Sequence, residues 1–289
     1  MKNNFLINMT PNFEFDDSTL NEKDLALVKN FASEERASYG KAPIGRDIFS
    51  FINYQENLRI ISYDFNKSAK QLDAMIFKYP SSKYTWIVIN GNKPLIYQIF
   101  AIAHEYYHFK KDIPNGILGI PCDFESLNER EIKANRFAAE FLLPSDAIKE
   151  AINNIIIRDG KFDESNYLNI VMQLSSRYCI PFNVTCFRIN EEGFSIKKIK
   201  KDFFKDNEDI INNLLKQTDP FKELLNTKNN YLENDNLKLL NQLYLDEYIT
   251  EIEFITMSKD INLCDEFINS TLFYIEENDE SNNAFKIFT

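Results

Sequence analysis

The sequence predicts an α+β fold in which a small, mainly antiparallel sheet of three strands packs among helices. Short segments rich in β-branched and aromatic residues occupy positions 58–63, 74–79 and 84–90, as expected of strands. The next segment, Leu95–Phe109, has fifteen residues without Gly or Pro and is more apolar than a surface helix. Helical spacing of apolar residues precedes and follows this block. These features favour a sheet and a buried helix at the centre, with further helices around them.

Two helices are predicted before the first strand. The pattern T-x-x-E at Thr19 and Glu22 resembles a capping box, and apolar residues keep helical spacing from there to about Ser38. Asp47 is placed to open a second, short helix over Ile48–Tyr54. The N-terminal part is therefore expected to supply two helices that pack against the sheet.

The segment Tyr84–Asn90 (YTWIVIN) carries the strongest strand pattern in the chain. Two interpretations fit it equally well. As an exposed edge strand, it would let a bound peptide join the sheet as one more strand. As an ordinary packed strand, it would have a neighbour on both sides.

The helix predicted over Leu95–Phe109 contains the sequence HEYYH. Its two histidines, His104 and His108, are the only histidines in the chain, and residues four apart lie on one helix face. Both imidazoles can therefore point at one cation, and Glu105 can reach a water bound to that cation. This H-E-x-x-H arrangement supplies two metal ligands and a general base. The alternative is a pair of core histidines whose hydrogen bonds are satisfied by protein groups.

A catalytic zinc site needs a third protein ligand in addition to water. The segment after the motif is predicted to be a loop over Asp112–Cys122, followed by a helix over Glu125–Leu143 that Pro144 ends. Its acidic residues are the candidates for the third ligand. They are Asp112, Asp123, Glu125, Glu129, Glu131 and Glu140.

Helical spacing favours Glu131, which lies 23 residues beyond His108. Its helix face carries small and apolar residues such as Ala134, and a carboxylate buried there needs a partner, which a metal can be. The face of Glu129 includes Lys133, Arg136 and Glu140 and is predicted to be solvated. The alternative for Glu131 is a surface position on a charged helix.

The charge of the chain is concentrated near its C-terminus. Residues 205–289 have seven Lys or Arg and eighteen Asp or Glu, whereas residues 1–204 have 26 of each, so this segment carries the whole net charge of −11. The segment is predicted to be helical throughout. Its predicted helices are Glu208–Gln217, Pro220–Leu225, Leu237–Tyr248, Glu251–Met257 and Asp265–Glu276. The acidic balance disfavours direct binding of nucleic acid.

The remaining sequence signals indicate a cytoplasmic location. The four cysteines, Cys122, Cys179, Cys186 and Cys264, form no CxxC pair, and scattered thiols suit a reducing compartment. The N-terminus lacks the apolar core of a signal peptide. No run approaches the roughly 20 apolar residues of a membrane span, so no membrane association is expected.

Two segments of the sequence resemble motifs of a known family. HEYYH, followed by EIKANRFAAEFLLP at Glu131–Pro144, is similar to the ImmA/IrrE family of zincin-like metallopeptidases. That family has H-E-x-x-H and then E-x-x-A-N-x-F-A-A-x-L-L-x-P, and the second pattern matches at nearly every defined position. The resemblance covers about residues 22–190. It implies a zincin-like metallopeptidase domain over 1–194 and leaves 205–289 as an acidic helical domain.

The resemblance also implies a site and an activity. The site is gluzincin-like, with His104, His108 and Glu131 on zinc, Glu105 as the base, and Asn135 steadying the ligands from behind. Manganese or iron is an alternative to zinc, because a His₂Glu set accepts several divalent ions. The activity implied is cleavage of a protein substrate, a DNA-binding transcriptional repressor, with no direct contact to nucleic acid. The oligomeric state stays open.

Three helices are predicted after the ligand helix, over Ser145–Ile157, Asp163–Tyr178 and Phe182–Asn190. Residues 163–190 resemble the helix-turn-helix-like element that follows the peptidase core in the family. The last of these helices offers only Arg188 to a DNA backbone. A packing role is therefore favoured over a DNA-reading one.

A second function stays open beside the peptidase. The chain could be a non-catalytic, antitoxin-like regulator that keeps a metal site and sequesters its partner. Some relatives have a further histidine shortly after the motif, whereas Phe109–Asp112 has none. The nearby tyrosines Tyr97, Tyr106 and Tyr107 are predicted to be packing residues rather than substitutes for it. Glu105 argues for the peptidase, because a purely structural metal site needs no base.

Overall fold

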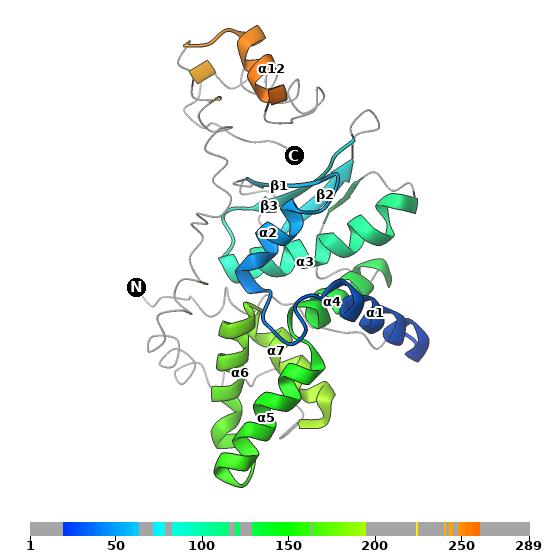
Figure 1. Cartoon of the computed structure of the whole chain (residues 1–289), viewed down its shortest axis with the longest axis vertical. Helices are drawn as coiled ribbons and strands as arrows, with labels where there is room; N and C mark the ends of the chain where they lie inside the picture. Colours follow the sequence, from blue (N-terminus) through cyan, green and yellow to red (C-terminus); the bar gives the residue numbers. More distant parts are fainter. Residues whose placement is uncertain are drawn as a thin grey trace.

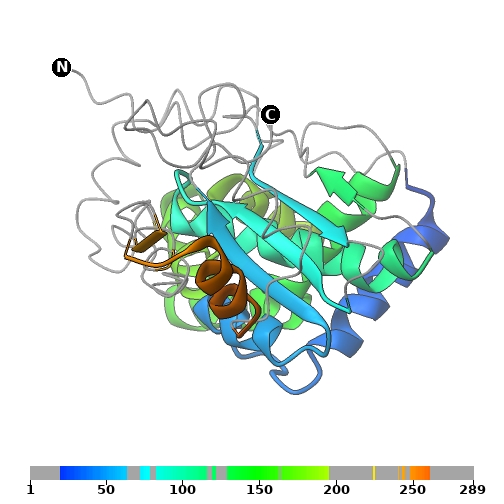
Figure 2. The ribbon, with the colours of Figure 1, turned by 90° about the horizontal axis from the view of Figure 1, so that it is seen from above.

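The structure is a computed structural model of the chain. It describes residues 20–63, 72–78, 83–115, 119–121, 129–162, 164–194 and 248–260, together with the single positions 224, 240, 243 and 244. The described residues form an α+β fold, as predicted, with one sheet stacked on layers of helices (Figure 1). Seen from above the sheet, the strands lie over the helices that follow them in the chain (Figure 2).

The sheet has four strands in the order β1-β3-β2-β4. Their bounds are Leu58–Tyr63 for β1, Ala74–Lys78 for β2, Thr85–Asn90 for β3 and Gly119–Pro121 for β4. Strand β2 is antiparallel to β3 and β4, whereas β1 is parallel to β3, with Leu58 opposite Thr85.

The small, mainly antiparallel sheet is confirmed, since β2 is antiparallel to both of its neighbours, but the sheet has a fourth strand and one parallel pair that were not predicted. Strand β4 lies inside the segment predicted to be a loop, and the β1–β3 pair is parallel. The parallel pair follows from the connections. Few residues separate β2 from β3, which favours an antiparallel hairpin, whereas ten residues, 64–73, separate β1 from β2 and let β1 pair on the far side of β3.

Strand β3 is an interior strand of this sheet, which decides between the two interpretations of its sequence. It is paired with β1 on one side and β2 on the other, so it is not an exposed edge. All six of its residues are buried: Ile87 and Ile89 join the main core cluster, and Trp86 and Val88 alternate with them. Burial on both faces explains why the strand is an almost continuous apolar run.

Helix α3, Leu95–Lys111, packs against β2 and β3 on one face of the sheet (Figure 1). It begins after Pro94, whose carbonyl accepts hydrogen bonds from the backbone N–H groups of Tyr97 and Gln98. Every residue from Leu95 to His108 is buried. This confirms the buried helix expected from its apolar composition, and it places HEYYH inside the domain.

The other helices follow α3 in layers. Helix α4, Glu129–Leu142, packs against α3 and against α1, Glu22–Glu35, and it also contacts α7, Phe182–Ile189. Helix α2, Ile48–Asn53, packs on β1 and α3. Helices α5, Ser145–Asp159, and α6, Glu164–Tyr178, complete the end of the molecule away from the sheet (Figure 1).

The start of α1 differs from the prediction. Asn21 is its N-cap, and its Oδ1 accepts a hydrogen bond from the backbone N–H of Asp24 at 2.9 Å. Thr19, predicted to cap this helix, lies outside the described residues. Asn satisfies the free N–H groups of a first turn as well as Thr does, so the helix begins two residues later than the T-x-x-E pattern indicated.

Of the predicted C-terminal helices, one falls wholly within the described residues. Helix α12 spans Glu251–Asp260, where Glu251–Met257 was predicted, and Thr250 caps it through Glu253. The remaining predicted helices of this segment lie wholly or largely outside the described residues. None of the helices that could be searched combines the length and the apolar character needed to cross a membrane.

Candidate metal centre

The side chains of His104 and His108 on α3 and of Glu131 on α4 converge on one point. The two Nε2 atoms of the histidines are 3.0 Å apart. Glu131 places Oε2 3.1 Å from His104 Nε2 and Oε1 3.4 Å from His108 Nε2. Both histidines are fully buried, and Glu131 is 5% exposed. The structure therefore brings together the three residues that the sequence singled out as ligands.

The two helices bring these residues together by simple periodicity. The i, i+4 spacing puts both imidazoles on the face of α3 that packs on α4. On α4, Glu131 shares its face with Ala134 and Ala138, which are fully buried. Small side chains let the helix pack closely there, so a carboxylate near its start is carried into the interior.

The donor atoms fit a divalent metal ion. Ligand atoms bound tetrahedrally about 2.0–2.1 Å from zinc lie roughly 3.3 Å from one another. The two Nε2 atoms are 3.0 Å apart, and each lies 3.1–3.4 Å from a different carboxylate oxygen of Glu131, so the three side chains are close enough to share one ion. Two imidazole nitrogens and a carboxylate are also the donor set of many catalytic zinc sites. His104, His108 and Glu131 thus form a buried group able to hold a metal ion.

Each imidazole is held from behind by a hydrogen bond at its other nitrogen. Asn135 Oδ1, from α4, accepts from His104 Nδ1 at 2.8 Å. Asp112 Oδ2, at the end of α3, accepts from His108 Nδ1 at 2.5 Å. With Nδ1 donating, each Nε2 keeps its lone pair and directs it towards the shared point.

The pKa values of the three residues reflect this crowding of polar groups. Burial lowers the pKa of His104. Burial also acts to lower the pKa of His108, but hydrogen bonds to Asp112 and Glu131 and the charge of Glu105 outweigh it and raise this pKa to about 9. For Glu131, burial acts to raise the pKa, and hydrogen bonds to both histidines outweigh it and lower this pKa to about 2. The pKa values of His108 and Glu131 thus favour positive charge at the site, whereas the pKa of His104 disfavours it.

Glu105 lies beside this group with no exposed surface. It follows His104 on α3, and its negative charge acts on His108. A carboxylate in such a buried position is held close to the ligand atoms by the helix itself. From this position, the carboxylate of Glu105 is able to exchange a proton with a water at the centre of the site.

The other acidic candidates for the third ligand have different partners. Asp112 accepts a hydrogen bond from Nδ1 of His108. The sequence contained an indication of this contact, because Asp112 is four residues beyond His108, at the end of the helix. Glu129 is exposed and pairs with Lys133 at 2.6 Å. Asp123 and Glu125 lie outside the described residues.

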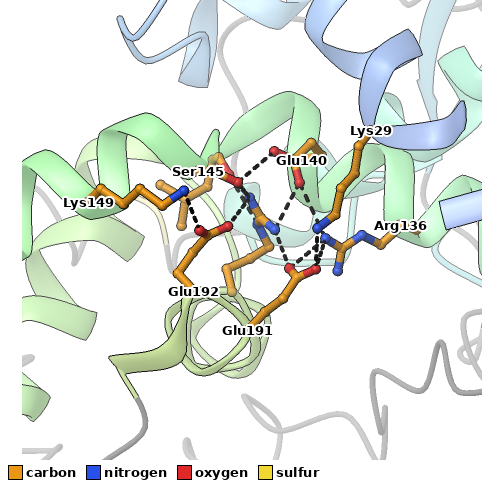
Figure 3. Close-up of polar contacts among 9 residues, drawn as sticks. Lys29, Arg136, Glu140, Ser145, Lys149, Glu191 and Glu192 are labelled. Carbon is orange, nitrogen blue, oxygen red and sulfur yellow. Dashed lines mark hydrogen bonds and ion pairs between the residues drawn. The ribbon is translucent and has the colours of Figure 1, made fainter. Parts of the chain in front are cut away.

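Glu140 belongs to a buried ion cluster, so the prediction of a solvated face for Arg136 and Glu140 was wrong. Arg136 has no exposed surface, and Glu140 is 7% exposed. Arg136 bonds to both carboxylate oxygens of Glu191 at 2.5 Å (Figure 3). Arg188 pairs with Glu140 at 2.8 Å and also with Glu191. The partners come from α7 and from the short helical segment η4, Asn190–Phe194. They lie about 50 residues further along the chain, where the periodicity of one helix cannot reveal them.

The cluster also settles the role of the segment that resembles a helix-turn-helix. Arg188, the one cation that its last helix offers, is fully buried. Its guanidinium donates to the carbonyl of Leu143 at 3.1 and 3.2 Å, where α4 has just ended, and to Ser145 Oγ at 3.1 Å. The packing role predicted for this helix is confirmed, since Arg188 holds α7 against the end of α4.

The tyrosines near the motif are packing residues, as predicted. Tyr106 donates its hydroxyl to Glu35 of α1 and, at 3.2 Å, to Gln55. Tyr107 packs against the rings of Phe31 and Phe137. These contacts fasten α3 to the neighbouring helices.

A helix bearing H-E-x-x-H, packed on a mixed sheet and met by a glutamate from a later helix, defines a zincin-like metallopeptidase domain. Residues 55–190 match the model of one such family, Peptidase_M78, the IrrE N-terminal-like domain. This match confirms the resemblance seen in the sequence. The match includes all four residues of the H-E-x-x-H and Glu131 set. A search of curated proteins found no match to the chain.

Proposed function

We propose that the protein is a zinc-dependent endopeptidase that cuts a DNA-binding transcriptional repressor at a specific site. The observation that carries the proposal is the convergence of His104, His108 and Glu131 within a domain of a metallopeptidase family. The repressor as substrate is supported by the resemblance to the ImmA/IrrE family. Zinc is the metal of choice because two imidazoles and one carboxylate are a donor set that suits it.

The residues divide the chemistry among them. His104, His108 and Glu131 would hold the ion, which when bound supplies a Lewis acid that polarises a peptide carbonyl and lowers the pKa of water. Glu105 accepts a proton from the attacking water on its carboxylate and then gives that proton to the nitrogen of the leaving amine. Asn135 keeps the imidazole of His104 in place by accepting a hydrogen bond from its Nδ1 atom. The surrounding apolar residues exclude bulk water from these groups.

The substitution Glu105→Gln tests this proposal. Purified full-length protein with zinc is incubated with a DNA-binding repressor encoded next to its gene, and fragments are followed by gel and mass spectrometry. We expect cleavage to fall by about 10²–10⁴-fold, the usual contribution of a general base, while zinc stays bound. The matched control is Glu129→Gln, which changes an exposed glutamate and should cleave like the unchanged protein.

Two results would contradict the proposal. If Glu105→Gln cleaves as fast as the unchanged protein, Glu105 is not the base. If the unchanged protein binds zinc and its partner but yields no chelator-sensitive fragment, the non-catalytic regulator becomes the better account.

A further inference from the structure

The two imidazoles of the metal centre are held by chemically different groups. A neutral amide oxygen, from Asn135 on α4, accepts from His104. A carboxylate oxygen of Asp112, the C-cap residue of α3, accepts from His108. Hydrogen bonds to a charged acceptor are shorter and stronger than those to a neutral one. The two ligands are therefore not equivalent.

Asp112 makes two hydrogen bonds to His108. It ends α3, and its backbone N–H donates to the carbonyl of His108 at 2.9 Å, while its side chain accepts from the imidazole of the same residue. Asp112 is 8% exposed, so water competes little for its carboxylate. The last turn of α3 and the ring orientation of His108 are thereby fixed by one residue.

We propose that Asp112 is a positioning residue of the metal centre, which fixes the ring and tautomer of His108 and strengthens its Nε2 as a metal ligand. The inference rests on the proposed function, since it assumes that a metal is the partner of Nε2. A carboxylate can only accept at this nitrogen, so Nδ1 carries the proton and Nε2 is left with its lone pair. Such outer partners of a ligating histidine orient the ring and increase its basicity.

Asp112 also adds charge to the centre. Together with Glu105 and Glu131 it places three carboxylates around two imidazoles in a buried site. A divalent cation bound there leaves one net negative charge, whereas removal of the Asp112 charge leaves none. The charge and the hydrogen bond act in the same direction, so both should contribute to affinity, and two substitutions can separate them.

The experiment measures Zn²⁺ affinity of the full-length chain by competition with a chromophoric chelator. Asp112→Ala removes both the acceptor and the charge, and it should weaken Zn²⁺ binding by about 10–100-fold. Asp112→Asn keeps an oxygen acceptor and loses only the charge, so its loss should be smaller than that of the alanine variant. Asp73→Asn is the matched control, because Asp73 is a partly buried carboxylate that pairs with Lys93 outside the centre, and its affinity should not change.

Thermal unfolding of the same variants without metal separates positioning from a purely structural role at the end of α3. A purely structural Asp112 would lower the unfolding temperature and leave Zn²⁺ affinity unchanged, and that result would overturn the inference. An alanine variant that binds Zn²⁺ within threefold of the unchanged protein would overturn it as well. If the alanine variant does not fold, Asp112→Leu, which also lacks an acceptor and the charge, decides by the same affinity criterion.

Failure of the proposed function is recognised separately. If the unchanged protein binds Zn²⁺ but cleaves nothing, the peptidase proposal fails, and the affinities of the Asp112 variants still decide this inference. If the unchanged protein binds no Zn²⁺, both are overturned.

Discussion

The buried ion cluster between α4 and α7 gives a quantitative prediction for stability. Glu191 is its common partner: it bonds to Arg136 and Arg188 and pairs with Lys29 at 2.5 Å. The substitution Glu191→Gln keeps the shape of the side chain and removes its charge. The two guanidiniums, both fully buried, would then share Glu140 as their nearest carboxylate.

The expected loss follows from two separate arguments. Removing one partner of a buried ion pair typically costs about 3–5 kcal/mol, because the charge left behind stays buried. The pKa of Glu191 gives a similar figure. Burial acts to raise it, but the charges of Arg188 and Arg136 outweigh burial and lower it to about 2 from the usual 4.5. A difference of this size corresponds to a contribution on the order of 3 kcal/mol above pH 4.5, which is lost as the pH falls through 2.

Urea unfolding at pH 7, followed by circular dichroism, measures this loss. With a urea dependence of about 1–3 kcal/mol per molar, the midpoint of Glu191→Gln should fall by roughly 1–3 M. The control is Glu150→Gln, which removes one member of the exposed pair that Glu150 forms with Lys41 at 2.9 Å. Exposed pairs contribute little, so its midpoint should hardly move. If the two variants unfold at the same midpoint, the charges of the cluster are hydrated and the reasoning is wrong.

Two further predictions concern the metal centre. In metal-free protein, the raised pKa of His108 contributes stability that is fully present below pH 6.5 and is lost as the pH rises through about 9. Melting temperatures measured in chelator should therefore decrease as the pH is raised from 6.5 to 9. A melting temperature that does not change over this range would contradict the raised pKa. Removal of zinc should also lower the melting temperature at any one pH, because free zinc at about a thousand times its Kd adds roughly 4 kcal/mol to folding, and equal melting with and without chelator would mean that no metal is bound to the folded state.

The site was predictable from the sequence because its chemistry is local. His104 and His108 are related by helical spacing, and Glu131 was separated from the other acids by the small residues on its own helix face. Each inference needed only the periodicity of one helix. The periodicity of one helix does not show that the two helices meet at one point. That expectation came from the match of the second motif to the family.

The parts that could not be predicted depend on contacts between distant residues. The parallel pairing of Leu58–Tyr63 with β3 is decided by where the chain returns to the sheet, which no local pattern records. Arg136 looked solvated because its partner Glu191 lies 55 residues away. By contrast, Asp112 was weighed as a metal ligand, and its contact with His108 Nδ1 is a local one that the four-residue spacing could have indicated.

One metal ion is expected to be bound by two histidines of α3 and one glutamate of α4. Crystals of the full-length protein grown with zinc, and measured on both sides of the zinc absorption edge, would locate that ion. We expect one anomalous peak about 2.0–2.2 Å from Nε2 of His104, Nε2 of His108 and a carboxylate oxygen of Glu131. Zinc-saturated crystals with no peak at this position, or with Glu131 directed away from it, would show that these residues do not bind the metal.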